Sequence, residues 1–105
     1  MAGDIEAIKP IVIEYANAVR QVLPVDKVVL YGSYAKGNAT ELSDVDICFF
    51  ITNLTDDNWL EIMIQLRMIS LNYKLFFSPM VYHVSDLYDD NPFINGVIST
   101  GIEIQ

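Results

Sequence analysis

The sequence has few of the residues that form disulfide bonds or bind structural metal ions. Its 105 residues include one cysteine, Cys48, and one histidine, His83. A single cysteine makes no disulfide framework and no cysteine metal cluster within the chain. Cys48 also lies in an apolar run, where a small buried side chain fits. We therefore expect a protein of a reducing compartment and predict a cytoplasmic location.

Basic residues and long apolar runs are also scarce. Six Lys and Arg residues stand against fourteen Asp and Glu residues, for a net charge of −8. This balance argues against direct binding to nucleic acid, whose phosphates attract basic proteins. No apolar run approaches the ~20 residues of a membrane span, and residues 1–10 lack the basic and apolar regions of a secretion signal. The sequence predicts no membrane association.

Apolar residues make up 52% of the chain, which is enough for the core of one domain over residues 1–105. Their periodicity predicts the secondary structure. The expected elements are a helix over 4–23, strands over 27–31 and 46–51, a helix from Asp56 or Asp57 to Asn72, a strand over 75–84, and a short helix between Asn91 and Gly101. This order predicts an α/β (α+β) fold, a small mixed β-sheet with helices packed on one side.

Prolines and capping residues refine these predictions. Asp4 is a candidate N-cap for the first helix, and Pro10 predicts a kink or a broken start there. Pro79 cannot donate to a strand ladder, so it predicts a bulge or an edge strand. Asn91 followed by proline is typical of a helix start, and Gly101 is typical of a helix end.

The stretch GSYAKGNATELSDVD, residues 32–46, carries the candidate site. Asp44 and Asp46 are two residues apart at the head of an apolar run, so a strand would point them to one face. Two such carboxylates are tolerated mainly around a cation, and Mg²⁺ takes one or two carboxylates together with substrate phosphates. Gly32 permits close approach to its backbone, and the Ser33 hydroxyl can bond a phosphate oxygen. The pattern favours metal-dependent transfer from a nucleoside triphosphate.

These residues resemble the signature of the nucleotidyltransferases of the DNA polymerase β superfamily, Gly-Ser followed after about ten residues by Asp-x-Asp. The ending NPFINGVISTGIEI also resembles that of the family's minimal members. The resemblance implies a nucleotidyltransferase fold and an enzyme that uses Mg²⁺. It implies that Asp44 and Asp46 are the catalytic metal ligands and that Gly32 and Ser33 contact the nucleotide. The transferred group would be a nucleoside monophosphate, most simply AMP from ATP.

The resemblance also implies a partner. Stand-alone members of this size resemble the antitoxin of toxin–antitoxin modules, in which the toxin is a helical HEPN ribonuclease. The chemistry implied there is adenylylation of a tyrosine of the partner. The chain leaves no residues for an acceptor-binding domain, so we expect the acceptor to arrive with such a protein.

The sequence departs from the family pattern at the third carboxylate, which the family supplies from a later strand. Strand 75–84 contains no acid, and Ser78, Pro79 and Met80 occupy the expected region. Asp86, beyond the strand, is the nearest acid and a possible third one. Without a third carboxylate, the site binds metal ions more weakly and lacks a base for the attacking hydroxyl. The alternative is therefore a catalytically weak or inactive binding module of the same fold that neutralises a partner; a drug-modifying or RNA-tailing transferase is disfavoured by the acidic charge.

Four further residues have two interpretations each. His83 sits among apolar strand residues, which favours a structural histidine over a metal ligand. Tyr34 can stack on a nucleobase, although packing in the core is favoured. Arg20 and Lys36 can contact phosphates or pair with nearby acids, and the sequence does not separate these roles.

Overall fold

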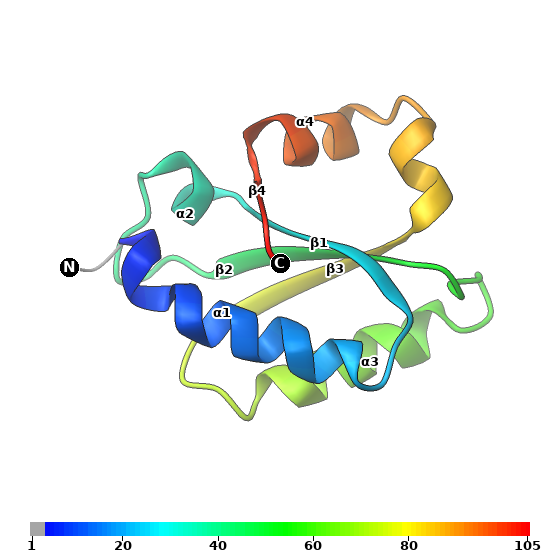
Figure 1. Ribbon diagram of the computed structural model, residues 1–105, viewed down its shortest axis with the longest axis horizontal. Coiled ribbons are helices and arrows are strands. Elements are labelled where there is room, and N and C mark those ends of the chain that lie inside the picture. The colour runs from blue at the N-terminus through cyan, green and yellow to red at the C-terminus, as the bar shows by residue number, and fades with distance from the viewer. Residues whose placement is uncertain (1–3) are drawn as a thin grey trace.

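The computed structural model describes residues 4–105. Its elements are α1 (Ile5–Arg20), β1 (Val25–Tyr31), α2 (Ser33–Lys36), β2 (Val45–Ile51), α3 (Trp59–Ser70), β3 (Phe77–His83), the 3-10 helix η1 (Val84–Tyr88), α4 (Pro92–Thr100) and β4 (Ile102–Glu103) (Figure 1). The strands form a four-stranded sheet in the order β3-β2-β1-β4. β1 is antiparallel to β2 and β4, whereas β2 and β3 are parallel. The predicted small mixed sheet is confirmed.

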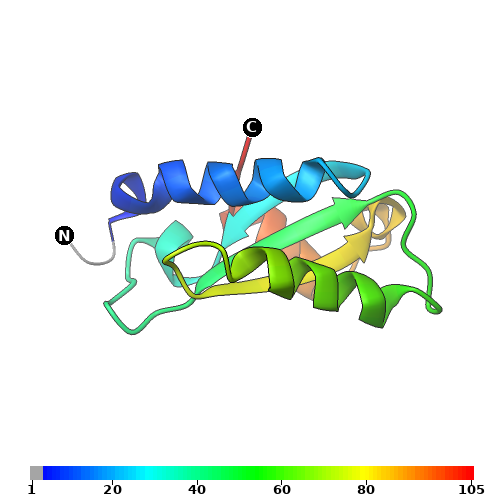
Figure 2. The same ribbon diagram turned by 90° about the horizontal axis from the view of Figure 1, so that it is seen from below.

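Helices cover both faces of this sheet, with α1 and α3 on one side and α4 on the other (Figure 1). Seen from the side of α1 and α3, the two helices lie in front of the strands and α4 lies behind them (Figure 2). On the α4 face, Val29, Cys48 and Phe50 pack against the helix. The predicted packing of helices on one side is therefore wrong for α4. The continuous apolar runs of β1 and β2 supply buried side chains to both faces, as in strands covered on both sides.

α1 begins as predicted. The Asp4 side chain accepts a hydrogen bond from the backbone N of Glu6 at 2.9 Å and caps the helix. α1 then continues without interruption through Pro10, so the broken start that this proline predicted is not present. The Tyr15 hydroxyl donates to the Leu66 carbonyl at 2.8 Å and joins α1 to α3 within the core.

The ends of α3 and α4 and the location of Pro79 can also be compared with the predictions. α3 starts after Asn58 instead of Asp56 or Asp57, because Asn58 and Thr55 bond each other's backbone N and close the preceding turn. α4 begins at Pro92 with Asn91 as its N-cap and ends at Gly101, as predicted. Pro79 lies in β3, an edge strand of the sheet, which is the location its missing donor requires.

The last residues return to the sheet beside β1. Ile102 pairs with Leu30, and the Glu103 carboxylate lies 3.0 Å from the Lys27 ammonium. Arg20 donates to the Ile104 carbonyl at 2.8 Å, so its guanidinium holds the chain end instead of a phosphate. No helix within residues 4–105 is long and apolar enough to cross a membrane.

Candidate active site

The turn between β1 and α2 consists of Gly32, since β1 ends at Tyr31 and α2 begins at Ser33. Gly32 has a φ of 76°, a conformation that side chains with a Cβ rarely adopt. A Cβ placed on Gly32 would also overlap the Oδ2 atom of Asp46. Glycine is therefore required at this position both by the backbone conformation and by the close approach of a carboxylate.

Asp44 and Asp46 lie at the start of β2, beside this turn. Asp46 is paired with Tyr31 in the antiparallel register of β1 and β2, which places it at the end of β1. Asp46 is partly buried, whereas Asp44 precedes the strand and is exposed. Burial, and then the negative charge of Asp44, raise the pKa of the Asp46 carboxyl. The structure thus brings together Gly32, Asp44 and Asp46, with Ser33 as the next residue of the turn.

The aspartate pair fits a hard cation that also takes ligands from a substrate. A cation would offset both causes of the raised Asp46 pKa, because it stabilises the ionised carboxylate. Within residues 4–105, no group of three or more His, Cys, Asp or Glu side chains is placed to hold a metal ion. Mg²⁺ accepts one or two carboxylates when water and phosphate oxygens complete its shell. The donor set is therefore suited to a metal–nucleotide complex.

The position of a third carboxylate is occupied by a serine. β3 runs parallel to β2, and Ser78 lies opposite Asp46. Asp86 follows the other end of β3, about 16 Å further along the strand direction at ~3.3 Å per residue. There its Oδ2 accepts from the backbone N of His83 at 3.1 Å and caps η1. The structure does not bring Asp86 to the aspartate pair.

The structure also shows the surroundings of His83, Tyr34 and Lys36, for which the sequence allowed two interpretations each. The His83 ring bonds the backbone N of Ser85 through Nδ1 and lies 3.1 Å from the Thr52 carbonyl through Nε2, so it is a structural histidine, as predicted. Tyr34 is 8% exposed and packs in the core between the sheet and α1, again as predicted. Lys36 is exposed and borders the site.

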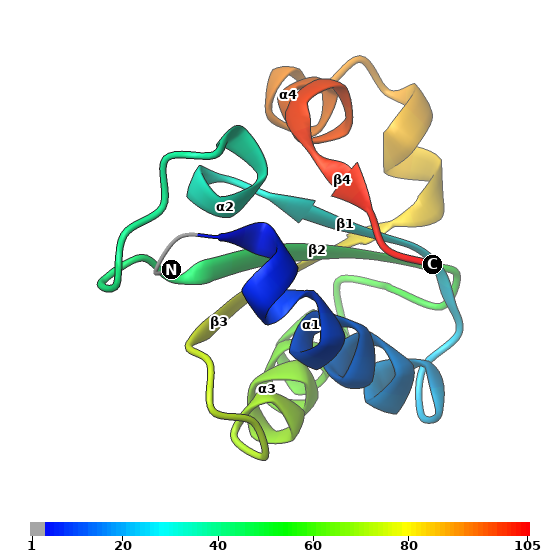
Figure 3. The same ribbon diagram turned by 60° about the vertical axis from the view of Figure 1, so that its left-hand side comes forward.

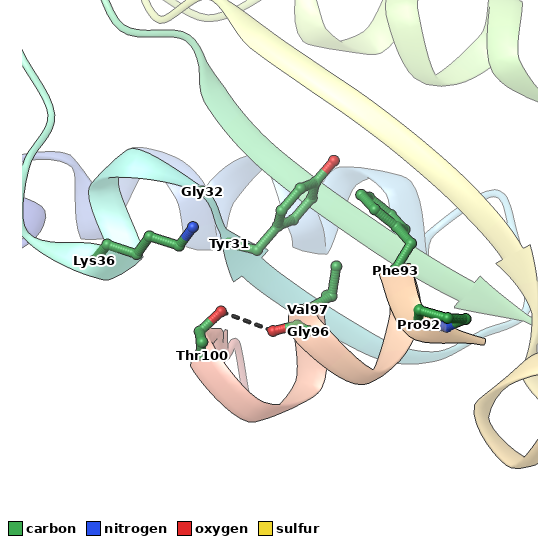
Figure 4. A pocket seen from close by; sticks show the side chains of 8 residues that line it. All are labelled: Tyr31, Gly32, Lys36, Pro92, Phe93, Gly96, Val97 and Thr100. Atoms are coloured by element: carbon green, nitrogen blue, oxygen red, sulfur yellow. Dashed lines mark hydrogen bonds between the residues drawn. The ribbon is translucent and has the colours of Figure 1, made fainter. Parts of the chain in front are cut away.

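A pocket of about 410 Å³ opens beside Gly32. The ribbons of α2 and α4 lie on the same side of β1 (Figures 1 and 3), and both helices contribute residues to the pocket lining. Its lining residues are Tyr31, Gly32, Lys36, Pro92, Phe93, Gly96, Val97 and Thr100 (Figure 4). Sequence reasoning missed this pocket because five of its eight lining residues come from α4, far along the chain from the Gly-Ser motif. The nearest sequence signal was the small residues of α4, which leave room along one side of the helix.

Comparison with known proteins agrees with this geometry. Residues 12–104 match the family described as "Polymerase beta, Nucleotidyltransferase". The chain belongs to the polymerase β family of nucleotidyltransferases. The matched range includes the Gly-Ser turn, the aspartate pair and α4, so the family assignment covers the whole candidate site. The predicted family and the predicted enzyme class are confirmed.

Two similar proteins extend over most of this nucleotidyltransferase. A protein of Methanocaldococcus jannaschii named "Putative protein adenylyltransferase" is 30% identical over 97 residues, which cover 90% of this chain and 95% of the relative. A crystal structure described as a "putative nucleotidyltransferase" from Sulfolobus solfataricus superposes with a TM-score of 0.64 at 18% identity, covering 92% of this chain and 78% of the other. The second likeness demonstrates the shared fold.

Proposed function

We propose that this nucleotidyltransferase transfers AMP from ATP to a hydroxyl group of a partner protein, with Mg²⁺ as cofactor. The observation that carries the proposal is the contact between Gly32 and Asp46, which places an open backbone turn directly against a carboxylate suited to metal binding. The name of the Methanocaldococcus jannaschii relative supports adenylyl transfer to a protein.

The chain's own residues have distinct tasks in this reaction. The acceptor hydroxyl oxygen forms a bond to the α-phosphorus, and the bond from that phosphorus to the bridging oxygen breaks, so that pyrophosphate leaves with the electron pair. Asp44 and Asp46 would hold the cation, and the Ser33 hydroxyl would donate to a phosphate oxygen. When bound, Mg²⁺ neutralises phosphate charge and stabilises the departing pyrophosphate. Gly32 lets the phosphates approach the backbone without a steric clash.

Among residues 4–105, no side chain is evident at the site as a base for the proton of the acceptor hydroxyl. Ser78 faces Asp46 across the strands, and a serine hydroxyl is too weakly basic to accept that proton near neutral pH. Asp86 is held at the other end of β3. The proposal therefore assigns the base to the partner protein or to water, and it expects transfer to be slow in the absence of the partner.

Exposed apolar residues beside the site support a protein acceptor. Leu42 is 94% exposed and lies two residues before Asp44. Phe76 is 82% exposed, and its carbonyl accepts a hydrogen bond from the backbone N of Val45 at 2.8 Å. Together with the net charge of −8, these side chains favour a partner with an apolar patch inside a basic surface. A helical HEPN-type toxin, with this chain as its antitoxin, is the partner we propose.

The experiment uses ATP labelled at the α-phosphate and a small helical HEPN-type protein as the acceptor. We expect label to reach that protein when Mg²⁺ is present, and to be lost in the Asp44→Asn and Asp46→Asn variants. Chelation of the metal should stop transfer in the same way. Absence of label on the partner, under conditions where the two proteins form a complex, would contradict the proposal.

The second candidate is a binding module that silences its partner without turnover. It is favoured by the serine opposite Asp46, because without a third acid the metal site is weaker. Silencing of the partner by a variant in which both Asp44 and Asp46 are replaced would establish this function. Loss of silencing in the same variant would establish the enzymatic one.

A further inference from the structure

We propose that the pocket between α2 and α4 binds the nucleobase of the donor nucleotide. This inference rests on the proposed function, because it assumes that the α-phosphate lies at the aspartate pair. Gly32 lines the pocket and also touches Asp46. A nucleoside attached to that phosphate therefore has the pocket within reach. Its volume of about 410 Å³ lies within the usual range for small-molecule sites.

The residues that line the pocket suit a flat aromatic ligand. The rings of Tyr31 and Phe93 meet edge to face, with centroids 5.8 Å apart and planes at 89°. Pro92 and Val97 add further apolar surface to the α4 side. Predominantly apolar and aromatic walls are typical of sites for nucleobases and similar rings, which bind through their faces and edges.

Charge among the lining residues is confined to the end of the pocket at Gly32, where the phosphates of the proposed nucleotide would lie. Of the eight lining residues, Lys36 alone carries a charge, and in Figure 4 its ammonium points toward Gly32 and Tyr31. A cation in this place suits a phosphate oxygen next to the turn. The α4 end offers no such donor: the Thr100 hydroxyl already donates to the Gly96 carbonyl at 2.7 Å. The pocket therefore favours phosphate at one end and an uncharged ring at the other.

The acceptor has a different approach to the same phosphate. An attacking hydroxyl must come from the side opposite the leaving pyrophosphate, and on the side of Ser78 the exposed ring of Phe76 directly precedes β3. The pocket is lined instead by the end of β1, by Lys36 of α2 and by α4. This leaves the pocket for the donor and the β3 side for the partner.

Gly96 is the strongest evidence that the pocket accommodates a ligand. It lies within α4, where glycine weakens a helix, yet a Cβ built on it would meet no atom within 4 Å. Neither packing nor backbone conformation requires a glycine here. Its small size instead keeps the pocket open along the helix.

Calorimetry with two probes tests the inference. The first probe is the Mg²⁺ complex of α,β-methylene ATP, and the second is Mg²⁺ tripolyphosphate, which has no nucleoside. Gly96→Leu should fill the pocket, weakening the affinity for the nucleotide at least tenfold while leaving that for tripolyphosphate unchanged. Ser99→Leu, on the exposed part of the same helix, is the control and should bind both probes like the wild type.

A second variant makes the test independent of the added bulk. Phe93→Ala removes one aromatic wall from a partly exposed position and should weaken nucleotide binding in the same selective way. Equal nucleotide affinity in the wild type, Gly96→Leu and Phe93→Ala would overturn the pocket assignment and leave the proposed function intact. A wild-type protein that binds neither probe would overturn the proposed function, and this inference with it.

Discussion

Gly32 and Asp46 lie so close together that the carboxylate of Asp46 occupies the space a Cβ on Gly32 would need. Gly32→Ala should therefore displace this carboxylate and reduce Mg²⁺-dependent nucleotide binding by tenfold or more. Gly37→Ala is the matched control: Gly37 has nearly the same φ, 79°, but a Cβ there would meet nothing within 4 Å. Gly37→Ala, at a left-handed residue with a ψ of 16°, should lose of order 1 kcal/mol of stability. Gly32→Ala should lose more, because its ψ of −150° lies in a region that glycine alone adopts readily and because its Cβ meets Asp46. Calorimetric titration should show the binding loss only in Gly32→Ala.

The raised pKa of Asp46 predicts a pH-dependent cost to stability. The folded state binds the proton of the Asp46 carboxyl more tightly than the unfolded state does. The stability that this proton contributes is therefore fully present below the pKa of the unfolded state, and it is lost as pH rises through the pKa of the folded state. Asp46→Asn removes the ionisation and should raise the Tm at pH 7 when no metal is present. The two proteins should converge in Tm at low pH. A lower Tm for Asp46→Asn at pH 7 would contradict the burial and repulsion that we assign to this carboxylate.

The charge of Asp44 contributes to that cost and can be tested separately. Asp44→Asn should lower the pKa of Asp46, because it removes the second cause of the shift while burial persists. Titration of the Asp46 carboxyl carbon by NMR would measure the change directly. We expect a smaller gain in Tm for Asp44→Asn than for Asp46→Asn, since burial is the larger of the two causes.

Ser78 offers a test of the missing third acid. It lies opposite Asp46 on β3, so Ser78→Asp would place a carboxylate next to the pair. If catalysis is limited by the lack of a base, transfer to the partner should become roughly a hundredfold faster, at the low end of the contribution of general bases. Ser78→Asn is the control of equal size without charge. A rate that is unchanged in both variants would mean that the partner already supplies the base.

The exposed apolar residues beside the site predict where the partner contacts this chain. Leu42→Ser and Phe76→Ser should weaken transfer to the partner while the affinity for the ATP analogue stays unchanged. Tyr88→Ser is the matched control, because Tyr88 is 83% exposed but lies in η1, beyond the opposite end of β3. A pull-down with quantified partner, combined with the labelled-ATP assay, separates these effects. Equal losses in all three variants would remove the assignment of this surface.

Two glycines near the C-terminal end should respond oppositely to alanine. Gly96→Ala should stabilise the protein by about 0.5–1 kcal/mol, since the added Cβ meets open space and favours the helix. Gly101→Ala should destabilise it by about 1–3 kcal/mol, because its Cβ would overlap the Val97 carbonyl and the Val29 side chain. Urea denaturation of the three proteins would measure both changes.

The elements that the sequence predicted correctly are those whose signals are local. The Asp4 and Asn91 caps, the edge location of Pro79 and the turn at Gly32 each follow from the conformation or hydrogen bonding of one or two residues. These features needed no knowledge of distant contacts. Asp44 precedes β2, so strand alternation alone does not place it beside Asp46, although its charge acts on the Asp46 carboxyl.

The features that were missed depend on tertiary structure. β4 has two residues, too few for a periodic pattern, and it exists because Leu30 and Val29 offer it an open edge. α4 covers the second face of the sheet because Cys48 and Phe50 are buried there, and a continuous apolar run does not reveal which face each helix will cover. The pocket depends on both of these placements, so it could not be inferred from the motif alone.

The attachment of the chain end to Arg20 also has a consequence for aggregation. Arg20 holds the carbonyls of Ile104 and Gln105, and β4 is the strand that covers the outer edge of β1 within residues 4–105. If this short strand opens, β1 presents unpaired backbone at Val29 and Leu30, an apolar part of its edge of the kind that recruits strands from other molecules. Arg20→Ala should therefore reveal itself first in faster amide exchange of β4 and in concentration-dependent fibril or oligomer formation, before global unfolding. We therefore expect the Arg20 guanidinium to hinder strand addition between molecules.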